Sequence, residues 1–128
     1  MIQKARKNGL LGEVMAARYL RAEGYLIAEA NFRTRQGEVD IIAQRDDMLI
    51  FCEVKTRSNT AIALPRESVD ARKQRRIVLA ALQYVRQIHF NGVMRFDVIE
   101  VTFTDNGSVI VQQLPDAFRV DESGPLGI

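Results

Sequence analysis

The sequence has only one cysteine, Cys52, among its 128 residues. A lone thiol excludes a disulfide framework, a C-x-x-C redox pair and a thiolate zinc cluster, and it fits a reducing compartment. Long apolar runs are also lacking, since the longest covers residues 77–82 and is far too short to span a bilayer. The apolar stretch after the basic N-terminus is interrupted by Glu13 and Arg18, unlike a signal peptide. We therefore expect a cytoplasmic protein that does not insert into membranes.

A strong charge imbalance is absent as well, because 18 basic residues face 16 acidic ones. A net charge of +2 does not by itself indicate a nucleic-acid partner. The basic residues are unevenly spread, however, and four of them fall within five positions: Arg72, Lys73, Arg75 and Arg76. The composition predicts one globular domain over residues 1–120, followed by a flexible tail over 121–128.

The spacing of apolar residues predicts the element order α-β-β-β-α-β-β. The first helix is expected over 8–23, capped by Asn8, with Leu10, Val14, Ala17 and Leu20 on its buried stripe. Strands are expected over 25–30, 38–44, 48–56, 95–103 and 108–112, and a second helix from Pro65 to about residue 87, ended by Asn91-Gly92. This order predicts an α/β fold in which a mixed sheet is flanked by both helices.

The segments 38–44 and 48–56 read as a hairpin around Asp46-Asp47. If these two residues form the whole loop, Asp40 lies opposite Glu53 and Glu38 lies opposite Lys55, and the four share one face. The other face then carries only apolar residues, namely Val39, Ile41, Ala43, Ile50, Cys52 and Val54. The predicted register therefore agrees with the hydrophobic pattern.

Opposed carboxylates repel each other, so the pair Asp40 and Glu53 requires a positive partner. Lys55 alone can supply it, which makes the cluster a structural ion pair. A divalent cation, Mg²⁺ or Mn²⁺, can also supply it, held by both carboxylates and the carbonyl of Val54, with water and phosphate oxygens completing the shell. Lys55 would then hold a water or neutralise charge on a phosphate, with Glu38 as its partner. Both interpretations stay open at this point.

The hairpin resembles the PD-(D/E)xK motif of restriction-endonuclease-like nucleases, in the strings GEVDIIA (37–43) and FCEVKTR (51–57). Together with Glu13, the chain looks most like the bacterial YraN-type family of uncharacterised proteins, which is similar to archaeal Holliday-junction resolvases. The likeness runs from Gly12-Glu13 through the strand that contains Asp97. Val39 stands where the motif has proline, at a position that touches no ligand.

The resemblance implies a role for each matching residue. Asp40 and Glu53 match the metal-binding carboxylates, Lys55 matches the catalytic lysine, and Glu13 matches an acidic residue that approaches the metal from the first helix. A solvated helix residue is the alternative for Glu13. Seven basic residues are candidates for DNA phosphate contacts, with a solvated surface as their alternative: Arg33, Arg35, Arg57, Arg72, Lys73, Arg75 and Arg76. Among the last four, 72, 75 and 76 are expected to share a helix face while 73 turns aside.

These observations predict a metal-dependent endonuclease that hydrolyses phosphodiester bonds in DNA, including branched DNA. Two alternatives remain. A nucleic-acid-binding module with the same fold would bind DNA in a salt-dependent manner without cutting it. A protein-interaction domain would not bind DNA at all. The likeness to resolvases also implies a homodimer, since symmetric cutting of two strands needs two sites.

Overall fold

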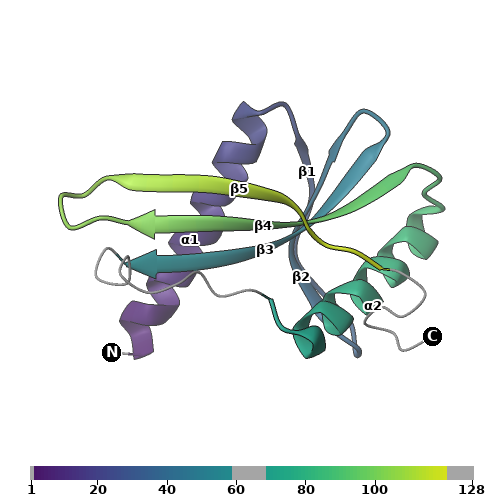
Figure 1. Cartoon of the computed structure of the whole chain (residues 1–128), viewed down its shortest axis with the longest axis horizontal. Helices are drawn as coiled ribbons and strands as arrows, with labels where there is room; N and C mark the ends of the chain where they lie inside the picture. The colour runs from purple at the N-terminus through teal and green to yellow at the C-terminus, as the bar shows by residue number, and fades with distance from the viewer. Residues whose placement is uncertain (1, 59–68, 121–128) are drawn as a thin grey trace.

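The predicted order of helices and strands is confirmed in the computed structural model, which describes residues 2–58 and 69–120, with side chains from Gly9 onward (Figure 1). The elements are α1 (Ile2–Ala22), β1 (Leu26–Arg33), β2 (Glu38–Arg45), β3 (Met48–Ser58), α2 (Ala71–Ile88), β4 (Val93–Phe103) and β5 (Val109–Phe118). Neither α1 nor α2 combines the length and apolar character needed to cross a membrane.

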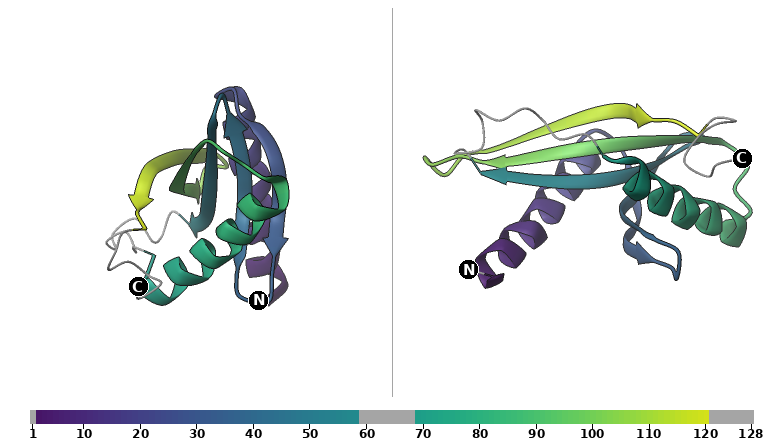
Figure 2. Two further views of the ribbon diagram at one scale, coloured as in Figure 1. Left: turned by 90° about the vertical axis from the view of Figure 1, so that its right-hand side faces the viewer. Right: turned by 60° about the horizontal axis from the view of Figure 1, so that its bottom comes forward.

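The five strands form one mixed sheet in the order β1-β2-β3-β4-β5. All neighbouring strands are antiparallel except β3 and β4, which are parallel. A parallel pair needs a crossover connection, and α2 lies within it. The two helices lie on opposite faces of the sheet (Figure 2), so both faces are covered.

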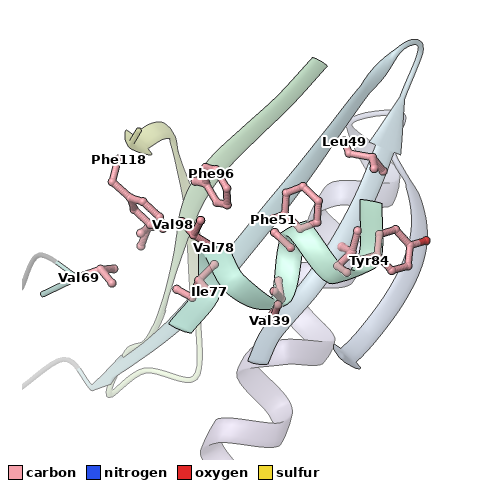
Figure 3. Close-up of a cluster of buried hydrophobic side chains, with 13 residues drawn as sticks. Val39, Leu49, Phe51, Val69, Ile77, Val78, Tyr84, Phe96, Val98 and Phe118 are labelled. Carbon is pink, nitrogen blue, oxygen red and sulfur yellow. The ribbon is translucent and has the colours of Figure 1, made fainter. Parts of the chain in front are cut away.

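Each helix packs against the sheet in a separate hydrophobic cluster. On the α1 side, Leu20 packs with Ile41, Cys52 and Ile99. Burial raises the pKa of the Cys52 thiol, in keeping with its predicted place on the apolar face of the hairpin. The α2 side is aromatic (Figure 3): Phe51 contacts Tyr84 and Phe96, and Phe96 stacks on Phe118 with ring centroids 5.1 Å apart.

The predicted start of the first helix is wrong, and its predicted buried stripe is right only at Ala17 and Leu20, which pack on the α1 side of the sheet. The helix α1 begins at Ile2, so Asn8 lies inside it rather than at its cap. Leu10 and Val14 are 58% and 46% exposed, whereas Ala16 and Leu20 are fully buried. The small residues decide which face is inward, because a Cβ on Gly12 would lie 2.2 Å from Oγ1 of Thr56 on β3. Close approach to the sheet therefore selects the face with small side chains.

Other element ends also differ from the sequence expectation. The strand β1 continues to Arg33 instead of ending at residue 30, so Asn31 and Arg33 belong to it. Pro65, the expected start of the second helix, and the expected tail over 121–128 lie outside the described residues. The helix α2 begins after its N-cap Asp70, and His89 ends it in the left-handed conformation, ahead of Asn91-Gly92.

The two-residue loop of the β2–β3 hairpin is confirmed. Pairing runs from Arg45↔Met48 to Ile41↔Cys52, the register predicted for a loop at Asp46-Asp47. The face of Val39 is predicted wrongly, because Val39 packs in the α2-side cluster while Ile41 packs in the α1-side cluster. The ladder ends at Ile41, and β2 no longer follows the alternation of β3 beyond that residue.

Candidate functional site

A polar cleft of about 610 Å³ lies where the pairing of β2 with β3 ends. Both helices and the first three strands contribute to its wall. Among the residues singled out from the sequence, the cleft brings together Glu13, Arg33, Glu38, Asp40, Glu53, Val54, Lys73 and Arg76. Residues far apart in the chain therefore meet at one end of the hairpin.

Gly37 allows α2 to approach this cleft. A Cβ at position 37 would lie 1.9 Å from the carbonyl oxygen of Arg76, which is impossible without moving the helix. Thr34 holds the turn before Gly37, since its backbone N–H donates to the Gly37 carbonyl at 2.8 Å. The absence of a side chain at Gly37 therefore sets how closely α2 lies against the start of β2.

Asp40 and Glu53 form the acidic centre of the cleft. Glu53 is only 7% exposed, and Oδ2 of Asp40 accepts a hydrogen bond from the backbone N–H of Val54 at 2.8 Å. Burial raises the pKa of Asp40 to about 7, and the negative charges of Glu53 and Glu13 add to this effect, against the lowering contribution of the Val54 N–H. Two carboxyl groups that lie close together and are shielded from water favour a bound cation.

Lys73 supplies a positive charge to this centre. Its Nζ lies 2.6 Å from Oε1 of Glu53, and the hydrogen bond to Glu53 raises the pKa of Lys73, opposed by its partial burial. Lys55 was one of the two partners that the sequence left open for this pair, and the ion pair is made by Lys73 instead. A contact between the first turn of α2 and a strand is long-range, so spacing along the hairpin cannot reveal it.

Lys55 lies on β3 two residues after Glu53, half-buried and outside the cleft wall. Within residues 9–58 and 69–120, it forms no ion pair. The sequence predicted that Glu38 pairs with Lys55. In the structure Glu38 pairs with Arg33 instead, with 3.3 Å between Oε2 of Glu38 and Nε of Arg33. The reason is that Glu38 lies beyond the β2–β3 ladder and is paired instead with Arg33 of β1.

Glu13 reaches the cleft from α1, as the resemblance implies. Its Oε2 accepts a hydrogen bond from Nδ2 of Asn31 at 3.3 Å. Asn31 was not predicted as a site residue. It adopts a positive φ of 55°, a conformation that asparagine tolerates better than most residues. An asparagine near a strand end was the available signal, but only the fold places it beside Glu13.

The basic candidates divide into two groups. Arg33, Lys73 and Arg76 line the cleft, whereas Arg35, Arg72 and Arg75 are exposed outside its wall. The predicted grouping on α2 is therefore wrong, because 73 and 76 share the cleft and 72 and 75 do not.

Arg57 lies apart from the cleft and has an acidic partner of its own. Its side chain is 18% exposed, and its Nε lies 3.4 Å from Oε2 of Glu100 on β4. Arg57 and Glu100 lie on neighbouring strands β3 and β4, so the buried carboxylate of Glu100 takes up this cation. The ion pair leaves little of Arg57 for contact with nucleic acid.

The donor set suits a hard divalent cation with few protein ligands. In the part of the chain that the structure describes, no group of three or more His, Cys, Asp or Glu residues has the geometry of a metal cage. Mg²⁺ commonly binds through one or two carboxylates and keeps several waters or substrate phosphates. Asp40, Glu53 and the adjacent backbone of Val54 fit that pattern.

The fold and cleft define an α/β protein with a mixed five-stranded sheet and a partly buried acidic pair in a cleft lined by both helices. The model of the uncharacterised protein family UPF0102 matches residues 12–101, and the chain belongs to this family. Similar relatives are UPF0102 proteins of Clostridium perfringens, 45% identical over 115 residues (88% of this chain, 93% of the relative), and of Syntrophomonas wolfei, 42% identical over 106 residues (82% and 92%). A third, from Dictyoglomus turgidum, is 41% identical over 116 residues (88% and 98%). Membership of an uncharacterised bacterial family, expected from the resemblance, is thereby confirmed.

Proposed function

We propose that this protein is a divalent-metal-dependent endonuclease of the PD-(D/E)xK type that acts on DNA in the cytoplasm. One observation carries the proposal: the carboxylates of Asp40 and Glu53 lie together in a cleft, and cations from α2 line the same cleft. Acidic side chains for a metal beside cations for a phosphate are what phosphodiester hydrolysis needs. The resemblance to PD-(D/E)xK nucleases points to the same chemistry.

Each side chain has a defined task in this proposal. Asp40 and Glu53 hold Mg²⁺ or Mn²⁺, with the carbonyl of Val54 as a third ligand. When bound, such an ion lowers the pKa of a coordinated water and stabilises charge on the phosphate. The Val54 N–H fixes the Asp40 carboxylate, and Asn31 fixes the Glu13 carboxylate. Glu13 orients the attacking water from the side of α1.

The cations of the cleft bind the DNA backbone. Arg76 on α2 and Arg33 on β1 lie on different walls of the cleft, so a phosphate between them is gripped from two sides. The Arg33 side chain is 74% exposed and its Glu38 partner 54% exposed. Such a surface ion pair is weak and opens at low cost when a phosphate competes.

A second function is favoured by one specific contact. Because Lys73 already neutralises Glu53, the acidic pair can be stable without metal in a protein that binds DNA and does not cut it. This alternative predicts DNA binding that falls with salt and does not depend on divalent ions.

The test is a cleavage assay at low salt with linear, single-stranded, flapped and four-way-junction DNA, each with Mg²⁺, Mn²⁺ or a chelator. Metal-dependent cutting of any of these substrates is expected. Binding without cutting under every condition would replace the endonuclease by the non-catalytic module. A protein that neither binds nor cuts any of them would contradict both.

A further inference from the structure

The first turn of α2 carries an unusual charge for a helix start. Helix N-termini favour acidic side chains because the helix dipole is positive there, yet the first turn of α2 has no acidic residue and contains Lys73. The backbone N–H of Lys73 donates to Oδ1 of the N-cap Asp70 at 2.8 Å, so this position is fixed close to the helix start. The Asp70 carboxylate offsets part of the charge of Lys73, and further compensation comes from outside the helix.

That compensation comes from the acidic pair. The Lys73 ammonium lies 2.6 Å from Glu53, whose side chain is 9% exposed, while the Lys73 side chain is 52% exposed. Glu53 is therefore held in the protein, and Lys73 is free to swing toward solvent on its flexible stem. The mobile member of the pair is the cation.

We propose that Lys73 is the resident counter-ion of Glu53 and is exchanged for the divalent cation when the metal binds. This inference rests on the proposed function for its metal, but it concerns which residue the metal must displace. A divalent cation on the Glu53 carboxylate would lie within a few ångströms of an ammonium bound to the same group, and two cations that close repel each other, so the metal and Lys73 compete for Glu53. The displaced ammonium stays in the cleft and binds a phosphate oxygen of the DNA.

The exchange predicts a specific effect on metal affinity. Without Lys73, Mn²⁺ meets no competing cation, so Lys73→Met binds Mn²⁺ about tenfold more tightly, a change that corresponds to about 1.4 kcal/mol. Lys73→Arg keeps a competing charge and retains an affinity near that of the wild type. Arg76→Gln is the matched control, since Arg76 also lines the cleft on α2 but does not bind Glu53. It removes the same formal charge without removing the competitor.

The experiment titrates Mn²⁺ into wild type and the three variants, with calorimetry for affinity and thermal unfolding as a second readout that is independent of catalysis. Lys73→Met is expected to have a lower Tm than the wild type in chelator, because Glu53 loses its partner, and a larger rise in Tm with Mn²⁺.

Equal Mn²⁺ affinity in Lys73→Met and Arg76→Gln would overturn the inference, since general charge would then explain the effect. Weaker binding by Lys73→Met than by the wild type would overturn it too. In both cases the wild type still binds metal and the proposed function stands. If no form of the protein binds Mn²⁺, the exchange and the metal-dependent function fail together.

Discussion

The backbone N–H of Val54 donates a 2.8 Å hydrogen bond to Oδ2 of Asp40, immediately beyond the last paired residues of β2 and β3. The Asp40 side chain thus bonds to the backbone of β3 where the strands no longer pair. This contact aims the carboxylate at β3, where Glu53 precedes Val54. The geometry of the acidic pair is therefore determined by where the hairpin stops pairing.

The raised pKa of Asp40 predicts a pH-dependent stability. The unfolded chain loses this proton near the ordinary pKa of 3.8, whereas the folded chain retains it to about pH 7. The folded state binds more protons between these values, so the free energy of unfolding falls as pH rises from about 4 to about 7. One pKa unit corresponds to about 1.4 kcal/mol, and we expect a loss of at least about that size.

This is measured by urea denaturation at pH 5 and pH 8 in the presence of a chelator. Asp40→Asn cannot ionise, so its loss of stability between the two pH values is smaller than that of the wild type. An equal change in both proteins would show that Asp40 titrates normally.

Gly37→Ala is expected to destabilise the protein by about 1–3 kcal/mol, as overpacking commonly does. The new Cβ would lie 1.9 Å from the Arg76 carbonyl oxygen, and backbone cannot move aside cheaply. Gly9→Ala is the control, because nothing lies within 4 Å of a Cβ there, and alanine in a helix is about 0.5–1 kcal/mol more favourable than glycine. Chemical denaturation measures the free energy of unfolding of both variants. An equal change in the two would contradict the close packing of Gly37 on α2.

Glu13→Gln is expected to lower the rate of metal-dependent cleavage by about 10- to 100-fold, a typical cost for a group that orients a metal site. The fold is retained, since glutamine keeps an oxygen that accepts the Asn31 hydrogen bond. Glu29→Gln is the control, because Glu29 is exposed on β1 outside the cleft wall. Single-turnover rates on the best substrate provide the comparison, and full activity in Glu13→Gln would leave Glu13 as a solvated helix residue.

Arg76→Gln is expected to weaken DNA binding. The slope of log affinity for DNA against log salt concentration should also fall by about the amount due to one phosphate contact. Arg86→Gln serves as the control, since Arg86 is exposed near the other end of α2. Binding is measured by fluorescence anisotropy at several salt concentrations. An unchanged slope for Arg76→Gln, or the same change for both variants, would remove Arg76 from the DNA interface.

Local pattern was enough to predict the element order and the register of the β2–β3 hairpin, because both depend on residues close in the chain. Asp40 was expected directly opposite Glu53, but the ladder ends at Ile41↔Cys52, and Asp40 reaches β3 through the Val54 N–H instead. The partner of Glu53 could not be predicted either, since Lys73 reaches it only after α2 packs on the sheet. The N-terminal half of the buried face of α1 was missed for a related reason: Gly12 and Ala16 lie inward because the sheet needs close approach there, and small residues carry little signal in a hydrophobic pattern.

The most direct test of the account compares cleavage by the wild type, Asp40→Asn and Asp47→Asn with Mg²⁺ or Mn²⁺ and with chelator. Asp47 is exposed in the hairpin loop, away from the cleft wall, so its variant controls for an Asp-to-Asn change elsewhere. We expect metal-dependent cleavage by the wild type and Asp47→Asn, and none by Asp40→Asn, although that variant still folds and binds DNA. Cleavage by Asp40→Asn at the wild-type rate, or cleavage that persists in chelator, would contradict a metal-dependent site built on Asp40 and Glu53.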